Sequence, residues 1–297
     1  MEIGLGIDQR FALSTDDQRA LAREAADLGY RSLWTPIGNT PEPFDICATW
    51  NRSSGLATGI AVVPLSGWSL EGLASVAKET HQRCGGAFTL GIGSGRVTDA
   101  PIRRMREAIA ELRPRLPGVR IYIGALGPQM LRLAGDRYDG VALNWCSTEH
   151  VRWCREQVAR GAGRAVTIHE YIRVCVDEDE DAARIAFAKM TLQYALARQD
   201  GDSAKGYRAH FARMGFDEAL TELEAQRARG ATEDELARAI APDLLRRVGY
   251  WGRPAGARDA FARLAEGLDI AVVRPVPARR NDAEAVRLAM RACAPKS

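Results

Sequence analysis

The sequence has little of the histidine and paired cysteine on which metal or nucleophilic chemistry is often built. Four histidines occur in 297 residues, and the six cysteines show no C-x-x-C pair and no histidine at metal-ligand spacing. We therefore expect neither a disulfide framework nor a zinc site, and we predict no metal-binding residues. Cys175 lies inside the apolar run 172–176 and is expected to be a small core residue.

Long apolar runs and a strong charge of one sign are also missing. No stretch approaches the roughly 20 apolar residues that a membrane span needs, and residues 1–7 lead directly into predicted structure. We therefore expect a cytoplasmic protein without a membrane partner. The net charge is only +3, and the basic cluster at 103–106 has acidic neighbours at helical spacing, so nucleic acid is not an expected partner.

What the sequence does contain is a regular alternation of short apolar strands and amphipathic helices. Ser14, followed by acidic residues, predicts the start of one helix, and Gly29 predicts its end. The predicted strands, rich in apolar and β-branched residues, cover residues 3–7, 32–35, 56–65, 87–92, 121–123, 140–143, 167–176 and 270–273.

This alternation predicts an α/β fold, a (β/α)8 TIM barrel of parallel strands buried on both faces. Residues 1–297 are expected to form a single barrel domain. Residues 179–247 are too long for one crossover and are predicted to be a helical insertion between strands 7 and 8. A doubly wound open sheet is the competing fold, but the strand count and the lack of a nucleotide fingerprint at the first strand favour the barrel.

Barrels of this kind bind ligands at the carboxyl ends of their strands, so the residues that follow each strand are the candidate site. These residues are rich in glycine, amide, hydroxyl and arginine side chains. That composition suits a bulky, partly anionic ligand better than a hydrolytic triad. No histidine is expected to be catalytic, because each lies in a predicted helix or at the start of a strand: His81, His150, His169 and His210.

The first glycine-rich strand end is Gly91-Ile92-Gly93-Ser94-Gly95-Arg96. Its G-x-G-x-G spacing, followed by Pro101, does not match a dinucleotide-binding fingerprint. Glycines here would expose backbone N–H groups, and Arg96 would offer a fork of donors to a phosphate. The alternative is a strand end that needs glycine only for a positive φ angle.

The second is Gly124-Ala125-Leu126-Gly127-Pro128, which predicts a turn into a helix with proline at its first position. The free N–H groups of Gln129 and Met130 would then point into the barrel mouth and form an anion site. The alternative is a well-formed strand-to-helix turn without a ligand.

The segment 121–145 resembles the luciferase-like monooxygenase superfamily, and especially its members that depend on coenzyme F420. The resemblance is carried by the run IYIGALGPQMLRLAG at 121–135, by Asp139-Gly140 and by Leu143-Asn144-Trp145. Similar stretches follow the same order along nearly the whole chain, at residues 1–7, 25–34, 85–95, 210–217 and 273–275.

The resemblance implies a barrel, usually a homodimer, that binds FMN or coenzyme F420 in its mouth. A non-prolyl cis peptide beside the cofactor ring would fall near Gly59, Ile60 and Ala61. Asp8, Gln9, Asn144 and Trp145 are the candidates for the polar and aromatic wall around ring and substrate. The implied phosphate-binding residues are Gly93, Ser94, Gly95, Arg96, Gly127, Pro128, Gln129 and Met130.

Two stretches depart from the family pattern. Many relatives have an acidic residue and a histidine after the second strand, where this chain has Thr35, Pro36 and Ile37. The stretch between Gly95 and Arg120 is also shorter in this chain than in most relatives.

Three functions are considered. The first is hydride transfer between coenzyme F420 and a small organic substrate, the second an FMN-dependent monooxygenase, and the third a cofactor-free barrel that acts as a binding or partner protein.

Overall fold

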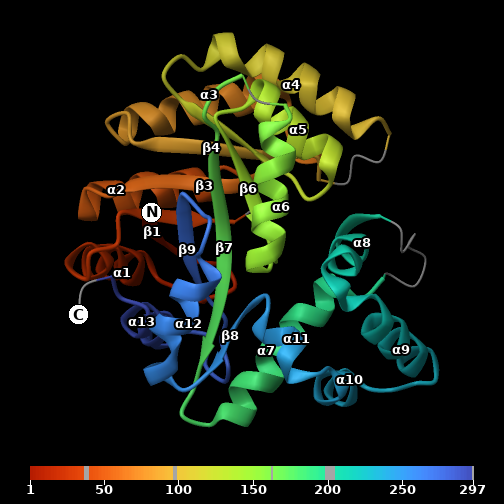
Figure 1. Cartoon of the computed structure of the whole chain (residues 1–297). Coiled ribbons are helices and arrows are strands. Elements are labelled where there is room, and N and C mark those ends of the chain that lie inside the picture. The colour runs from red at the N-terminus through yellow and green to blue at the C-terminus, as the bar shows by residue number, and fades with distance from the viewer. Residues whose placement is uncertain (37–39, 96–98, 162, 198–204, 296–297) are drawn as a thin grey trace.

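The computed structural model describes the chain except for residues 37–39, 96–98, 162, 198–204 and 296–297. Its centre is a closed ring of parallel strands (Figure 1). The order around the ring is β1-β2-β3-β4-β5-β6-β7-β9, and β9 pairs with β1 to close it. The ring strands are β1 (Glu2–Gly6), β2 (Ser32–Thr35), β3 (Ala57–Pro64), β4 (Phe88–Gly93), β5 (Arg120–Gly124), β6 (Gly140–Asn144), β7 (Thr167–Val176) and β9 (Ile270–Pro275).

The predicted (β/α)8 barrel is therefore confirmed, and each predicted strand corresponds to one strand of the ring. One further strand, β8 (Gly249–Gly252), was not predicted. It lies outside the ring and pairs in parallel with the carboxyl-terminal part of β7, with Arg173 opposite Gly249. Four residues between helices carry too little periodicity to predict a strand.

Helices cover the outside of the ring, and their starts follow the sequence signals. Ser14 caps α1 and forms a reciprocal capping box with Asp17. Gly29, with φ of 89°, follows the end of that helix. The helices packed around the barrel are α1 (Thr15–Asp27), α2 (Glu42–Ser54), α3 (Leu70–Arg83), α4 (Pro101–Arg115), α5 (Pro128–Arg137), α6 (Thr148–Ala159), α12 (Ala257–Leu264) and α13 (Ala283–Ala292).

The predicted helical insertion between the seventh and eighth ring strands is also present. It projects from the barrel at the lower right of Figure 1 and has a hydrophobic core of its own. Its helices are α7 (Glu180–Ala195), α8 (Gly206–Phe211), α9 (Asp217–Ala228), α10 (Glu233–Ala239) and α11 (Pro242–Arg246). The insertion leaves the ring from β7 and returns through β8, which pairs with β7 again.

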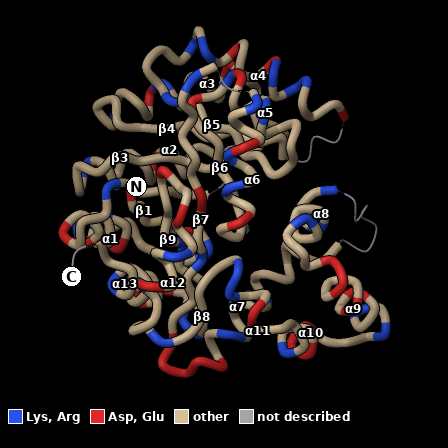
Figure 2. The backbone as a smooth tube through the Cα atoms, in the orientation of Figure 1, with Lys and Arg blue, Asp and Glu red and all other residues tan. Residues whose placement is uncertain are grey.

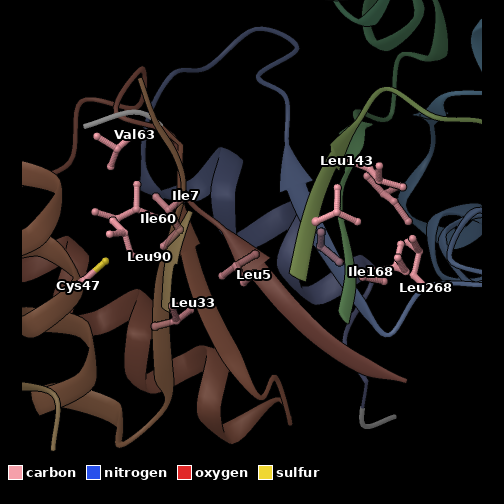
Figure 3. Packing of buried hydrophobic residues seen from close by; sticks show 14 of the residues in the cluster. Leu5, Ile7, Leu33, Cys47, Ile60, Val63, Leu90, Leu143, Ile168 and Leu268 are labelled. Carbon is pink, nitrogen blue, oxygen red and sulfur yellow. The ribbon is translucent and has the colours of Figure 1, made fainter. Parts of the chain in front are cut away.

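The largest hydrophobic core fills the layer between the ring and the outer helices. Leu33, Ile60 and Leu90 come from neighbouring strands and lie beside Cys47 of α2 (Figure 3). Charged residues lie mainly on the helices and loops in Figure 2, whereas β3, β4 and β5 are largely uncharged. No helix in the described part of the chain is both long and apolar enough to cross a membrane.

A second cluster fills the inside of the barrel with aromatic side chains. The Trp34 ring lies 4.3 Å from the His169 ring and 6.1 Å from Tyr122, measured between centroids. Glycine makes room for these rings, because a Cβ on Gly59 would lie 2.3 Å from Trp34 and one on Gly140 would lie 2.5 Å from Tyr122. Burial lowers the pKa of His169 to about 3, so the imidazole is uncharged at neutral pH and packs inside the barrel.

The backbone just after α6 lies so close to α5 that only glycine fits at position 161. A Cβ on Gly161, just after α6, would lie 2.0 Å from the backbone oxygen of Arg132 in α5. We therefore expect Gly161→Ala to lower the free energy of unfolding by about 1–3 kcal/mol, measured by urea denaturation. Gly163→Ala is the control, because nothing lies within 4 Å of that Cβ. Equal stability of the two variants would contradict this packing.

Candidate active site

The backbones of β3, β4 and β5 meet around one side chain at the carboxyl end of the barrel. Val62 follows a cis peptide bond between Ala61 and Val62. A Cβ added to Gly93 would lie 2.7 Å from the Val62 side chain, and one added to Gly124 would lie 3.3 Å from it. The cis bond therefore falls one bond beyond the segment predicted for it, and it adjoins both glycine-rich strand ends.

The turn after β5 has open space beside it. Gly127 caps α5 without a side-chain hydrogen bond, and Pro128 occupies the first turn. A Cβ on Gly127 would meet no atom within 4 Å. Arg213, from the insertion, donates a hydrogen bond to the Leu126 carbonyl at 3.1 Å. The start of α5 thus combines unpaired N–H groups, free space and a nearby guanidinium.

The strand end after β4 has the positive φ angle that the alternative without a ligand requires. Gly95 adopts φ of 60°, and a Cβ there would lie 2.7 Å from the Ser66 hydroxyl. Ser94 is half-buried between the two glycines. Arg96, the predicted phosphate fork, lies outside the described residues, as does Ile37.

The opposite side of the mouth, formed by β1, β6, β7 and β9, carries the charged groups. Asp8 follows β1, and its Oδ2 lies 2.5 Å from Nη2 of Arg274 in β9. Side-chain exposure is 12% for Asp8 and 8% for Arg274. Burial raises the pKa of Asp8, but the Arg274 guanidinium outweighs it and holds that pKa below its usual value. Asp8 is therefore ionised at neutral pH and is no proton donor.

Arg173 of β7 is a second buried guanidinium in this region. It donates a hydrogen bond of 2.8 Å to Asn144 Oδ1, and its Cζ lies 3.7 Å from the centre of the Trp145 ring. Its Nη2 is buried without a hydrogen-bond partner. None of the ion pairs among the described residues includes Arg173, and Glu170 interacts with it only as a more distant charge. Burial, then the charge of Arg274, lowers the pKa of Arg173 to about 9, so it stays protonated at pH 7.

The insertion covers this charged side with tyrosines. The Asn144 amide donates to the Tyr207 hydroxyl of α8 at 2.5 Å, and Tyr194 of α7 packs against Tyr207 with centroids 5.0 Å apart. Burial raises the pKa of Tyr207, which keeps its hydroxyl neutral. Because that oxygen accepts from Asn144, its own proton can be donated to another group.

Trp145 is held in a backbone conformation that side chains rarely adopt, with φ of 60°. Its carbonyl lies 2.9 Å from His210 Nε2, and its ring lies beneath Arg173. Contacts from both the barrel and the insertion therefore maintain the strained residue at the strand end.

The predicted site residues thus fall into three groups. Asn144, Trp145 and Asp8 come together at the charged side, whereas Gln9 is exposed beside them. The glycine-rich ends adjoin each other through Val62. Gly59 and Ile60 lie deeper in β3, where Gly59 packs under Trp34 and Ile60 belongs to the outer core.

Sequence reasoning missed Arg173 and the two tyrosines of the insertion. Residues alternate between the two faces of a strand, so Arg173 shares a face with His169 and Tyr171, both of which contact the barrel interior. That alternation was the available signal. No comparable signal links Tyr194 and Tyr207 to the mouth, since their position depends on how the insertion folds back.

Characterised enzymes with a closed parallel barrel of this kind bind their ligands in the mouth, at the carboxyl ends of the strands. A model of the luciferase-like monooxygenase family matches residues 98–269. The chain belongs to this family and is an oxidoreductase.

Two curated relatives are similar to the chain, and both are 5,10-methylenetetrahydromethanopterin reductases. The protein from Archaeoglobus fulgidus is 29% identical over 162 residues, which span 42% of this chain and 48% of the relative. The alignment therefore covers only about half of that reductase. The protein from Methanolobus tindarius is 26% identical over 311 aligned positions, covering 90% of this chain and 92% of the relative.

Solved structures of related barrels show the same fold. The coenzyme F420 dependent tetrahydromethanopterin reductase from Methanopyrus kandleri superposes with a TM-score of 0.75 at 17% identity, covering 97% of each chain. The oxygenating constituent of 3,6-diketocamphane monooxygenase from Pseudomonas putida, in complex with FMN, gives a TM-score of 0.59 at 14% identity, covering 93% and 92%. At these identities the likeness concerns the fold alone.

Proposed function

We propose that the protein transfers a hydride between coenzyme F420 and a small organic substrate. The observation that carries the proposal is Arg173, a buried, protonated guanidinium at the mouth without a carboxylate partner in the described residues. A buried cation of this kind is costly unless an anion pairs with it. The names of both curated relatives, which are reductases, favour the same chemistry.

The residues present fit a cofactor with a ring and an anionic tail. The open start of α5 offers backbone N–H groups to a phosphate, because Gly127 leaves free space and no side chain caps the helix. The strand ends around Val62 offer a backbone surface formed by glycine. A deazaflavin tail carries more negative charge than FMN, which suits a mouth that contains both Arg173 and Arg274.

Coenzyme F420, when bound, supplies or accepts the hydride at its ring. The residues of the chain bind the cofactor and orient the substrate. Arg173 holds an anionic group while Asn144 and Trp145 fix its guanidinium. The Tyr207 hydroxyl keeps its proton and can donate it as a hydrogen bond to a substrate oxygen, and Asp8 stays ionised to hold Arg274. The insertion places Tyr207 and Tyr194 over Asn144.

Titration of the purified protein with coenzyme F420 and with FMN separates the three functions considered. We expect saturable binding of the deazaflavin, followed by absorbance changes of the reduced or oxidised cofactor when a substrate is added. Tight binding of FMN without binding of F420 would replace this proposal with the monooxygenase. If neither cofactor raises the melting temperature, the cofactor-free barrel is favoured instead.

Gly127→Ala tests the phosphate position directly. Because the new Cβ meets nothing within 4 Å, we expect a loss of stability of no more than about 1 kcal/mol. The same methyl group would occupy the space proposed for the phosphate, so the Kd for F420 should rise at least about tenfold. Gly163→Ala, whose Cβ is equally free, is the matched control. Unchanged F420 affinity in Gly127→Ala would place the phosphate elsewhere.

A further inference from the structure

A second group of reactive side chains lies behind the mouth, between the barrel and the insertion. Cys146 precedes α6, His150 lies in its first turn, and His210 comes from α8. One ligand atom from each of the three lies within 4.8 Å of the other two, and all three residues are buried. The expectation of no metal ligands overlooked the regular spacing of Cys146, His150 and Cys154, and His210 is far from all three in the sequence.

The distances suit a tetrahedral ion. Cys146 Sγ lies 3.9 Å from His210 Nε2, and the rings of His150 and His210 are 4.9 Å apart between centroids. A zinc ion with usual bonds to sulfur and nitrogen holds two such ligand atoms about 3.6 Å apart. Small side-chain movements would therefore close the cluster around a metal.

Several polar atoms of the cluster lack partners. His150 Nε2, His210 Nδ1 and Glu170 Oε2 are buried without a hydrogen bond. The other nitrogen of His210 lies 2.9 Å from the Trp145 carbonyl. Nε2 is also the nitrogen that lies 3.9 Å from Cys146 Sγ, so a metal bound by Nε2 would replace the contact with the Trp145 carbonyl and leave the ring proton on Nδ1. Among these atoms, His150 Nε2 is the buried, unpaired ring nitrogen that a bound cation would satisfy.

Two neighbours extend the donor set. Cys154 is fully buried and lies one helical turn after His150, so the two share a face of α6. The Glu170 carboxylate accepts a hydrogen bond from the Cys146 backbone N–H at 2.6 Å, which holds the loop before α6. A second thiol is typical of structural zinc sites with cysteine and histidine ligands, whereas Glu170 acts only on the loop that carries Cys146.

We propose that Cys146, His150 and His210, with Cys154 in reach as a fourth ligand, bind a zinc ion that fastens the insertion to the barrel. Thiolate and imidazole donors select zinc over magnesium or calcium. Binding displaces the proton of the Cys146 thiol. The ion would fix α8, which carries Tyr207 over Asn144, so the metal would act as a structural clamp outside the proposed cofactor site.

The test uses the full-length, reduced protein, stripped of metal and then dialysed against zinc chloride. We expect about one equivalent of zinc to be retained, with a rise of several degrees in melting temperature. Cobalt(II) should give the intense visible bands of a tetrahedral site and a near-ultraviolet thiolate charge-transfer band. Absence of zinc retention and of the cobalt bands in the folded protein would overturn the proposal.

Cys146→Ala should reduce zinc affinity at least about tenfold and weaken the thiolate band. Cys293→Ala, another buried free cysteine at the end of α13, is the matched control and should keep both. His210→Ala provides an independent ligand deletion from the insertion side. Zinc bound equally well by Cys146→Ala and His210→Ala, with circular dichroism showing both folded, would overturn the site.

Discussion

Replacing Arg173 with methionine is expected to weaken coenzyme F420 binding about ten- to hundredfold, because a charge-assisted hydrogen bond contributes roughly 1.5–3 kcal/mol. The methionine keeps the bulk over Trp145 but removes the cation. The measurement is the Kd from fluorescence titration of the deazaflavin.

Two further variants separate charge from packing. Arg173→Lys retains a positive charge without the planar fork and should recover part of the affinity. Arg246→Met is the matched control, because Arg246 also lies over a tryptophan, 4.0 Å from the centre of the Trp251 ring, but belongs to α11. If Arg173→Met binds F420 as tightly as the wild type, Arg173 does not hold the anionic group.

Asp8→Asn is expected to lower the free energy of unfolding by about 3 kcal/mol at neutral pH, because it leaves the buried guanidinium of Arg274 without its counter-charge. Replacing both residues, as Asp8→Asn with Arg274→Met, should recover most of the loss. Asp136→Asn is the control at an exposed ion pair and should cost less than about 1 kcal/mol. Urea denaturation followed by circular dichroism measures all three.

The stability difference between the wild type and Asp8→Asn should depend on pH in a definite direction. The pKa of Asp8 is lower in the folded protein than its ordinary value of 3.8. Its stabilising effect is therefore complete above that value and is lost as the pH falls through the folded pKa. The gap between wild type and Asp8→Asn should narrow in acid. A gap that stays constant would show that Asp8 acts through packing rather than charge.

The barrel could be predicted because its determinants are local. The strand Ser32–Thr35 has the predicted bounds, and α1 begins after Ser14 and ends before Gly29 as predicted, since apolar periodicity, Ser caps and glycine stops each act within a few residues. The four-residue β8 has no such pattern. It is a strand only because β7 is long enough to extend beyond its ring neighbours and offer it a partner.

The candidate site was predictable in part for the same reason. Asp8, Asn144 and Trp145 follow strands directly, so strand order places them at the mouth. Arg173 lies within a strand, and His210 and Tyr207 lie in the insertion. Their contacts depend on how the insertion docks on the barrel, which no local pattern specifies. A single domain over residues 1–297 and a homodimer remain predictions.

The pairing of β8 with β7 also has an evolutionary consequence. The chain departs from β7 into α7 and returns alongside the same strand, so the whole excursion begins and ends at one place on the ring. When the two ends of an inserted segment are fixed next to each other, the entropic cost of closing it rises only slowly with the length of the segment. Lineages could therefore exchange or resize this part to suit new substrates while the eight-strand ring stayed intact.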